Sequence, residues 1–520
     1  MNKPNTLDIQ ITNEDPSLST HDAIALCIFA NESSQQQQHL LPPAHDADGD
    51  DRNAPWRDVY ARLLSDGEFK GEADAALYLR VPGRASGTHG LLLVGLGAHA
   101  DCNRAALRRA AGMALRTARE NRVRSLFFVL PEIAGESPET VVQAIVEGAI
   151  FGLYDGDFYQ NHDEPSHIVE RLNIVIAAST ASDELKAATE RARIVAEAVN
   201  WTRTLADEPG RALPPREFAR RAAEMASEFG LRVESLTAEE VRARGMGGLW
   251  GVGQGSDEEP ALIVVRYEPE GATDDDELWA FIGKGITFDT GGISIKHGLD
   301  MYEMKSDMAG GAAALGALRA IAQLKPSRRI VAIVPSAENM PSGRSIKPGD
   351  IVKTLGGYTI EVVDTDAEGR LVLVDGIAYA RELGATRIVD LATLTGSIIV
   401  ALGDHRTGLF SNDDAWAANV SAAAERACEP IWRMPVSDDY KKRIESDIAD
   451  FKNYGGRPDA TSAALLLSKF AADTPWVHLD IAGTSWYDDP QPHAPKGSTG
   501  TGVRTLVELA CADDGRLTES

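Results

Sequence analysis

The chain has 520 residues, 43% of them hydrophobic, and a formal net charge of −26 at pH 7. This length is more than one hydrophobic core supports, so we expect at least two domains. The acidic charge repels phosphate backbones and therefore disfavours nucleic acid as a partner.

Targeting signals and cysteine motifs are not evident in the sequence. Residues 1–6 lack an apolar signal segment, and no apolar run approaches the roughly 18 residues of a membrane helix. We therefore expect a cytoplasmic protein with no membrane partner. The 4 cysteines are scattered without CxxC spacing, which predicts neither a disulfide framework nor a thiolate zinc site.

The first part of the chain alternates strand and helix patterns, which predicts a small α/β domain with a largely parallel sheet over residues 1–182. The expected strands are 22–29, 91–94, 125–130 and 172–176, and the expected helices are 103–120 and 138–154. Residues 31–51 are polar and Gln-rich, which predicts a mobile loop. Residues 95–100, GLGAHA, loosely fit the GxGxxG/A dinucleotide-binding pattern, but Glu132 lies too far along the chain to be the ribose-binding acid. An ordinary tight turn is favoured there.

A long amphipathic pattern over residues 183–206 predicts a helix that connects two domains. Proline and glycine then interrupt the chain, and we expect a larger α/β catalytic domain over residues 207–520, with a mixed, mostly parallel sheet. No GxxxxGK motif occurs, so a P-loop nucleotide site has no support.

A first group of candidate site residues follows a predicted buried strand at 278–281. Lys284, Asp289 and Lys296 come directly after it, where open α/β sheets place their ligands. Asp307 precedes a helix of small residues. Taken alone, Asp307 is as well explained as a helix cap, but beside the other charges we interpret it as a ligand.

A second group is the acidic turn 364–370, DTDAEGR, which holds three carboxylates and one guanidinium. The strand pattern 359–363 precedes it and the apolar run 371–377 follows, so we expect the turn at the end of a core strand. Carboxylates gathered in an interior repel one another unless cations compensate. A metal site is therefore favoured over a solvated acidic loop. Oxygen ligands without cysteine or clustered histidine favour Mg²⁺ or Mn²⁺, with Zn²⁺ also compatible.

These motifs resemble the leucyl aminopeptidase family of dinuclear metallopeptidases, which remove N-terminal residues from peptides. The resemblance covers most of residues 207–512. The matching segments are 245–256, 283–296, 307–308, 338–343, 347–350, 365–370, 391–396 and 478–484.

The resemblance implies two divalent cations, Mn²⁺ or Zn²⁺, with Mg²⁺ as an alternative. It implies that Asp289 and Glu368 bridge them and that Asp366 holds one through its side chain and backbone carbonyl. Lys284 and Asp307 would complete the other site.

The resemblance also assigns roles to the two remaining positively charged side chains of these groups. It implies that Lys296 steadies the oxyanion and that Arg370 holds a bicarbonate ion that relays a proton. A salt bridge from Arg370 to its neighbouring carboxylates is the structural interpretation, and it is compatible with the bicarbonate role. His297 and His478 are interpreted as structural. The family forms hexamers around an interior cavity, which implies a homohexamer acting on peptide substrates.

The sequence departs from the family at two places. Asp364 stands where asparagine is usual, which adds a charge beside the metals, and small residues would be expected at Pro458 and Asp459. We attach no mechanism to the second departure. A dinuclear phosphohydrolase and a non-catalytic binding protein on a peptidase fold remain alternatives. The first generally adds histidine ligands, and the second would show the loss of a ligand, of Lys296 or of Arg370.

Overall fold

The computed structural model describes residues 7–13, 22–30, 55–81, 90–161, 167–176 and 183–512. The loop predicted at 31–51 lies outside these residues. The chain divides into two compact units, the first formed by residues 1–197 with 489–496 and the second by 198–488 with 497–520. The boundary falls inside helix α5 (Asp183–Asp207), which contains the predicted connector.

The first unit is a six-stranded sheet in the order β1-β6-β5-β2-β4-β3, in which only the β3–β4 pairing is antiparallel. Its strands are β1 (Asp8–Thr12), β2 (Ala23–Ala30), β3 (Ala76–Arg80), β4 (Gly90–Ala98), β5 (Ser125–Val129) and β6 (Arg171–Val175). Its helices are α2 (Pro55–Ser65), α3 (Arg104–Glu120) and α4 (Pro138–Gly152). Alternate residues of β2 enter two separate cores, one with α3 and α4 and one with α2. The predicted parallel α/β domain is confirmed.

The glycines at 95–97 do not form the expected turn between strand and helix, because β4 continues through them to Ala98. Gly97 has φ +74, at a register shift in the pairing of β4 with β2. A Cβ at Gly95 would lie 1.8 Å from the Glu72 carbonyl oxygen. Close backbone approach therefore accounts for this glycine pair.

The second unit is built on a mixed nine-stranded sheet with the order β16-β15-β18-β14-β9-β11-β8-β7, in which β10 also pairs with β11. The central strands β18, β14, β9, β11 and β10 are parallel, and β15, β8 and β7 add antiparallel pairings. The bounds are β7 (Arg232–Leu236), β8 (Ala261–Tyr267), β9 (Leu278–Gly283), β10 (Gly285–Asp289), β11 (Arg329–Asn339), β14 (Arg387–Ala392), β15 (Thr407–Ser411), β16 (Ile431–Arg433) and β18 (Trp476–Asp480). The predicted mixed, mostly parallel sheet is confirmed.

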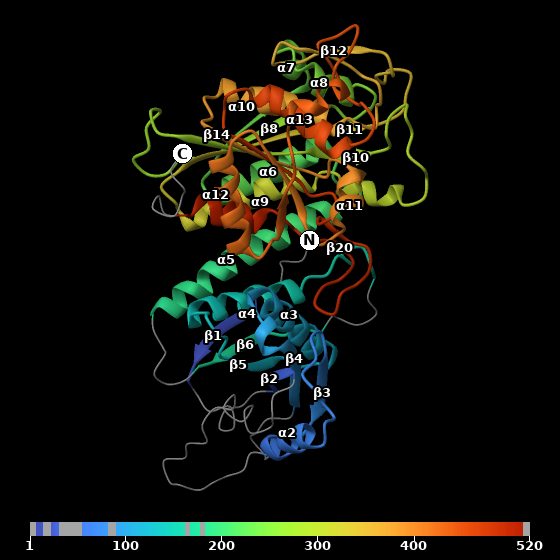
Figure 1. Ribbon diagram of the computed structural model, residues 1–520. Helices are drawn as coiled ribbons and strands as arrows, with labels where there is room; N and C mark the ends of the chain where they lie inside the picture. The colour runs from blue at the N-terminus through green and yellow to red at the C-terminus, as the bar shows by residue number, and fades with distance from the viewer. Residues whose placement is uncertain are drawn as a thin grey trace. The chain divides into compact units, whose positions relative to one another are not determined.

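Helices cover both faces of this sheet (Figure 1): α8, α10 and α13 lie on one face, and α6, α9 and α12 on the other. The helices are α6 (Pro215–Glu228), α7 (Ala238–Ala243), α8 (Gly247–Gly253), α9 (Ala309–Leu324), α10 (Gly369–Glu382), α11 (Gly396–Leu402), α12 (Asp414–Ala427), α13 (Asp459–Ala471) and α14 (Val503–Ala510). Among the described residues, none of the helices combines the length and the hydropathy needed to cross a bilayer.

The acidic turn follows a strand, as the sequence predicted, but this strand is not part of the main sheet. It follows β13 (Thr359–Glu361), which belongs to a small sheet with β12 (Ile351–Lys353) and β17 (Phe451–Lys452). A second small sheet pairs β19 (Trp486–Tyr487) with β20 (Gly497–Ser498). The apolar run after the turn forms the buried helix α10. The acidic turn therefore lies between β13 and α10, and the start of α10 places it at the edge of the main sheet.

Candidate metal centre

The candidate site lies where the parallel strands β9, β10 and β14 end. Lys284 separates β9 from β10, Asp289 is the last residue of β10, and Thr393 follows β14. Helix α9 comes close to this edge, since a Cβ at Gly310 would lie 2.1 Å from the Leu391 carbonyl oxygen. The small residues of α9 thus allow the helix to pack directly against the strand ends.

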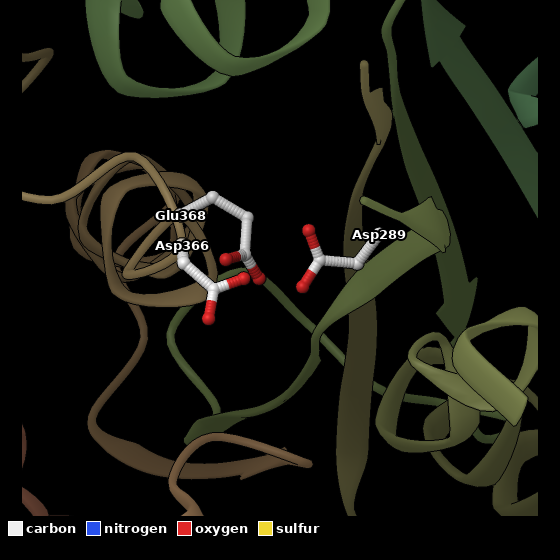
Figure 2. A group of neighbouring side chains, drawn as sticks. All are labelled: Asp289, Asp366 and Glu368. Atoms are coloured by element: carbon white, nitrogen blue, oxygen red, sulfur yellow. The ribbon is translucent and has the colours of Figure 1, made fainter. Parts of the chain in front are cut away.

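Three carboxylates converge at this edge. Asp289, Asp366 and Glu368 each offer an oxygen within 4.8 Å of the others. Figure 2 shows Asp366 and Glu368, from the turn before α10, facing Asp289 on β10. The side chains of Asp289 and Glu368 are each 2% exposed, whereas that of Asp366 is 35% exposed. The cluster is therefore open to solvent on the side of Asp366.

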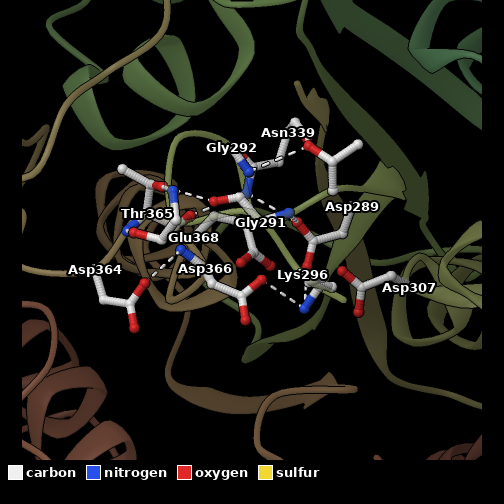
Figure 3. Close-up of polar contacts among 12 residues, drawn as sticks. Asp289, Gly291, Gly292, Lys296, Asp307, Asn339, Asp364, Thr365, Asp366 and Glu368 are labelled. Carbon is white, nitrogen blue, oxygen red and sulfur yellow. Dashed lines mark hydrogen bonds and ion pairs between the residues drawn. The ribbon is translucent and has the colours of Figure 1, made fainter. Parts of the chain in front are cut away.

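Two lysines neutralise part of this charge. The Lys284 Nζ lies 2.8 Å from Asp307 and 2.7 Å from Glu368 Oε1. The Lys296 Nζ lies 2.9 Å from Asp289 Oδ2 and 2.6 Å from Asp366 Oδ1. Figure 3 shows this lysine beside the carboxylates. The structure thus brings together all five predicted metal ligands and Lys296, from three separate segments of the chain.

The electrostatics of the cluster favour bound cations. Burial raises the pKa of Glu368, and the neighbouring Asp289 charge adds to this, so both outweigh the attraction of Lys284. Burial likewise raises the pKa of Asp307. For Lys284, burial acts to lower the pKa, but Asp307, Glu368 and Asp289 together raise it. Carboxylates that resist ionisation despite adjacent lysines indicate too little positive charge at this place.

The carboxylate oxygens Asp307 Oδ2, Asp366 Oδ1 and Glu368 Oε1 are buried and have no hydrogen-bond donor with suitable geometry among the described residues. Their contacts are the ion pairs with the two lysines. Hard oxygen donors of this kind suit divalent cations, and four carboxylates against two lysines leave a negative site. The residues present therefore fit the metals that the sequence led us to expect.

Asp307 is not a helix cap. Helix α9 begins after Met308 without a side-chain cap, and Asp307 instead accepts hydrogen bonds from Lys284 Nζ and, at 2.6 Å, from Thr393 Oγ1. The Thr393 carbonyl also accepts from Lys284 Nζ at 3.1 Å. Thr393 lies in a segment that matched the family, but the sequence alone assigned it no role.

Asn339 and Thr365 hold the two halves of the cluster together, a role that was not evident from the sequence. Asn339 Nδ2 donates to Asp289 Oδ1 at 2.8 Å and to the Thr365 carbonyl at 3.0 Å. Thr365 Oγ1 donates to the Gly291 carbonyl at 2.6 Å. These bonds tie the acidic turn to the loop that carries Lys296.

Asp364, the first departure from the family, borders the cluster. Its Oδ1 accepts the Asp366 N–H at 3.0 Å, which stabilises the turn. In Figure 3 Asp364 lies beyond Asp366 as seen from Asp289. The extra charge raises the pKa of Asp366, after the larger effects of burial and Asp289.

Arg370 pairs with a residue far along the chain rather than with its neighbouring carboxylates. Its Nη1 and Nη2 donate to Asp459 at 2.9 and 3.2 Å, and Nη1 also donates to the Asn453 carbonyl at 2.8 Å. Among the described residues its ion-pair partner is Asp459, so the predicted salt bridge to its neighbouring carboxylates is wrong. Asp459, to which no mechanism could be attached from the sequence, thus contacts a predicted catalytic residue.

The two histidines differ in burial. His297 is exposed, whereas His478 is fully buried in β18, with Nδ1 2.6 Å from Asp390 Oδ1. Asp390 also accepts from Trp476 Nε1 at 2.6 Å. Burial acts to lower the pKa of His478, but Asp390 outweighs it and raises the pKa. These contacts suit the structural role predicted for His478.

Comparison with known proteins gives a consistent result over both units. The catalytic domain of the cytosol aminopeptidase family matches residues 200–507, and the N-terminal domain of the same family matches residues 52–162. A probable cytosol aminopeptidase of Solibacter usitatus is 47% identical over 452 residues, covering 86% of this chain and 92% of its own. Another from Koribacter versatilis is 41% identical over 519 residues, covering 97% and 99% of the two chains.

Solved structures agree with the sequence relatives. A point mutant of tomato leucine aminopeptidase has a TM-score of 0.85 at 30% identity, covering 98% of this chain and 97% of its own. The bottromycin maturation enzyme BotP in complex with Mn has a TM-score of 0.80 at 32% identity, covering 95% and 99%.

Proposed function

The chain belongs to the cytosol aminopeptidase family, and we propose that its reaction takes place at the carboxylate and lysine cluster at the edge of the main sheet. Such an enzyme is a metal-dependent aminopeptidase that releases N-terminal residues from peptides. The observation that carries the location is the convergence of Asp289, Asp366 and Glu368 within 4.8 Å, with two lysines against them.

We propose that the cluster holds two divalent cations. Asp289 and Glu368 would contact both, Asp366 one, and Lys284 with Asp307 the other. The paired positions of Lys284 and Lys296 support this division, since each lysine contacts a different pair of carboxylates. The solved relative in complex with Mn makes Mn²⁺ our first choice, ahead of Zn²⁺ and Mg²⁺.

When bound, such cations polarise a carbonyl and make water a nucleophile at neutral pH. The protein's own contribution is to hold charges around them. Lys284 must release a proton before its Nζ can act as a ligand. Without the cations, the neighbouring carboxylates hold that proton; with the cations bound, these carboxylates would contact the cations instead. Burial acts to lower the pKa of Lys296, but Asp289, Glu368 and other carboxylates raise it, which favours the ammonium form in the cation-free site.

Lys296 is also the better placed lysine for substrate. Its side chain is 25% exposed, against 4% for Lys284, so a peptide carbonyl entering from solvent can reach its Nζ. We propose that Lys296 stabilises the oxyanion that develops on that carbonyl. The resemblance implies a bicarbonate ion on Arg370, but both terminal nitrogens of this guanidinium donate to Asp459.

The family resemblance further leads us to propose a cytoplasmic homohexamer. Sedimentation velocity of the full chain, read together with activity across the same concentrations, tests the assembly. A monomer that is fully active would contradict it.

The function is tested by removing metal and adding it back. We expect chelated protein to lose hydrolysis of leucyl anilide and to regain it with Mn²⁺, Zn²⁺ or Mg²⁺, while a phosphomonoester stays intact throughout. Asp438→Asn, at an exposed carboxylate of the same unit, serves as a control that should change neither metal content nor rate. Phosphomonoester hydrolysis with no anilide hydrolysis would support the phosphohydrolase alternative instead.

A further inference from the structure

We propose that Asp459 is the resident anion of Arg370 and stands where the family resemblance placed a free bicarbonate ion, so that this enzyme works without added bicarbonate. The proposal rests on the function proposed above. It concerns a positioning residue, whose side chain contacts Arg370, and it gives a role to a sequence departure that otherwise has none.

The first argument is the geometry of the pair. Both terminal nitrogens of Arg370 donate to Asp459, Nη1 to Oδ1 at 2.9 Å and Nη2 to Oδ2 at 3.2 Å. This two-point contact is the arrangement in which a guanidinium binds a planar carboxylate or carbonate. A bicarbonate ion would need the same two nitrogens. Asp459 therefore fills the end of the guanidinium that a free anion would use.

The second argument is access. The Arg370 side chain is 2% exposed, and its Nη1 also donates to the Asn453 carbonyl at 2.8 Å. Its Nε has no partner among the described residues, yet less than 1 Å² of this atom is exposed. A free anion would therefore find Nη1 and Nη2 of Arg370 already bonded and its Nε inaccessible from solvent.

The third argument is that Asp459 is well placed to remain an anion. It is the first residue of the 13-residue helix α13, where the partial positive charge of the helix end favours a carboxylate. The next N–H, of Ala460, donates to Ser397 Oγ at 2.8 Å, which fixes the start of the helix. The side chain is 18% exposed, so it keeps some hydration while it contacts a buried cation.

The pair also reaches the acidic turn. Arg370 is held to Asn453, and Asn453 Nδ2 donates to the Asp364 carbonyl at 2.6 Å while its Oδ1 accepts the Val363 N–H at 2.8 Å. Loss of Asp459 would leave a buried guanidinium without its counter-charge, which is strongly unfavourable. The turn that carries Asp366 would then loosen unless another anion entered.

Chemical rescue tests this role. Hydrolysis of leucyl anilide is measured in carbonate-free buffer with saturating Mn²⁺, and sodium bicarbonate or formate is then added at constant ionic strength. We expect the wild type to change less than twofold. We expect Asp459→Ala to lose about tenfold or more in kcat, as partners of ligand-bearing groups do, and to recover most of it with either anion.

Asp459→Asn and Asp414→Ala are the matched variants. Asparagine fills the same space without charge, so it should lower kcat and resist rescue. Asp414 is also the first residue of its helix and pairs with an arginine, Arg433, but its side chain is 90% exposed, so its removal should have no effect. Metal content of each variant, measured separately, distinguishes a failed anion role from a failed metal site.

A readout besides activity keeps the proposal testable if Asp459→Ala does not fold. Carbon-13 bicarbonate is titrated into wild-type protein and followed by NMR line broadening, and we expect no saturable binding. Bicarbonate dependence or saturable binding in the wild type overturns the proposal. So does a folded, metal-loaded Asp459→Ala enzyme that has full activity without anion or that no anion rescues.

Discussion

Replacing Lys296 by methionine should lower turnover while strengthening metal binding. Methionine keeps the unbranched length but removes the ammonium that lies 2.9 Å from Asp289 Oδ2 and 2.6 Å from Asp366 Oδ1. Both carboxylates would then be freer to hold a cation. A charge pair at about 4 Å is worth about 1 kcal/mol in water and about 4 kcal/mol at an effective dielectric constant near 20. The gain in cation affinity should fall between these values.

Turnover should move the other way. Loss of one donor to a developing oxyanion lowers kcat by about 100-fold to 1,000-fold. The assay is kcat for leucyl anilide at saturating Mn²⁺, together with the free Mn²⁺ concentration that gives half-maximal activity. Lys347→Met is the control, because that lysine pairs with Asp350 at 3.6 Å but is 67% exposed.

Opposite changes in the two quantities separate a catalytic lysine from a structural one. If kcat and metal affinity of Lys296→Met fall together, Lys296 supports the site rather than the oxyanion, and the reasoning is wrong.

Three other predictions address the acidic turn and helix α10. Glu368→Gln should lower metal content and reduce kcat by about 100-fold or more, measured by mass spectrometry and kinetics, and near-normal turnover with less metal would refute the dinuclear site. Burial raises the pKa of Asp375 to about 7, from an ordinary 3.8, against the N–H groups of Leu355 and Leu249. The stabilisation that the neutral Asp375 carboxyl contributes is therefore complete below about pH 4 and is lost as the pH rises through 7. Between pH 5 and 8, the free energy of unfolding in urea should fall by about 2 to 3 kcal/mol more for the wild type than for Asp375→Asn. A constant difference between the two proteins would contradict this. Compared with Asp364→Asn, the wild type should favour Leu-Lys over Leu-Glu in kcat/KM by roughly 0.5 to 2 kcal/mol, and salt should weaken this preference. An equal change in kcat/KM for Leu-Lys, Leu-Ala and Leu-Glu would exclude a role for Asp364 in specificity.

Periodic patterns in the sequence predicted most of the fold that carries the site. Strand β5 and helix α3 lie within one or two residues of their expected bounds, because their apolar positions follow one period and Asn103 caps the helix. Residues 371–377 could not be assigned to strand or helix in this way, since a run buried on every side has no period. They form the first half of α10, which is buried almost throughout.

The carboxylate and lysine cluster was predictable because its residues lie in short, dense motifs, whereas its supporting contacts were not predictable. Asn339 and Thr393 act on Asp289 and Asp307 across 50 and 86 residues. Such contacts depend on which strand ends are adjacent, and the strand order β14-β9-β11 cannot be predicted from any single motif. Only the pairing of the strands brings these side chains to the carboxylates.

The partner of Arg370 shows how charge balance can decide what sequence proximity cannot. Asp289, Asp307, Asp366 and Glu368 face two lysines, which leaves two negative charges for cations to satisfy. Had Arg370 paired with Glu368, it would have neutralised part of that negative charge and weakened cation binding. Its pairing with Asp459 keeps the guanidinium electrically neutralised on its own side. The pair thus holds the acidic turn in place without competing for the carboxylates that the proposed cations would require.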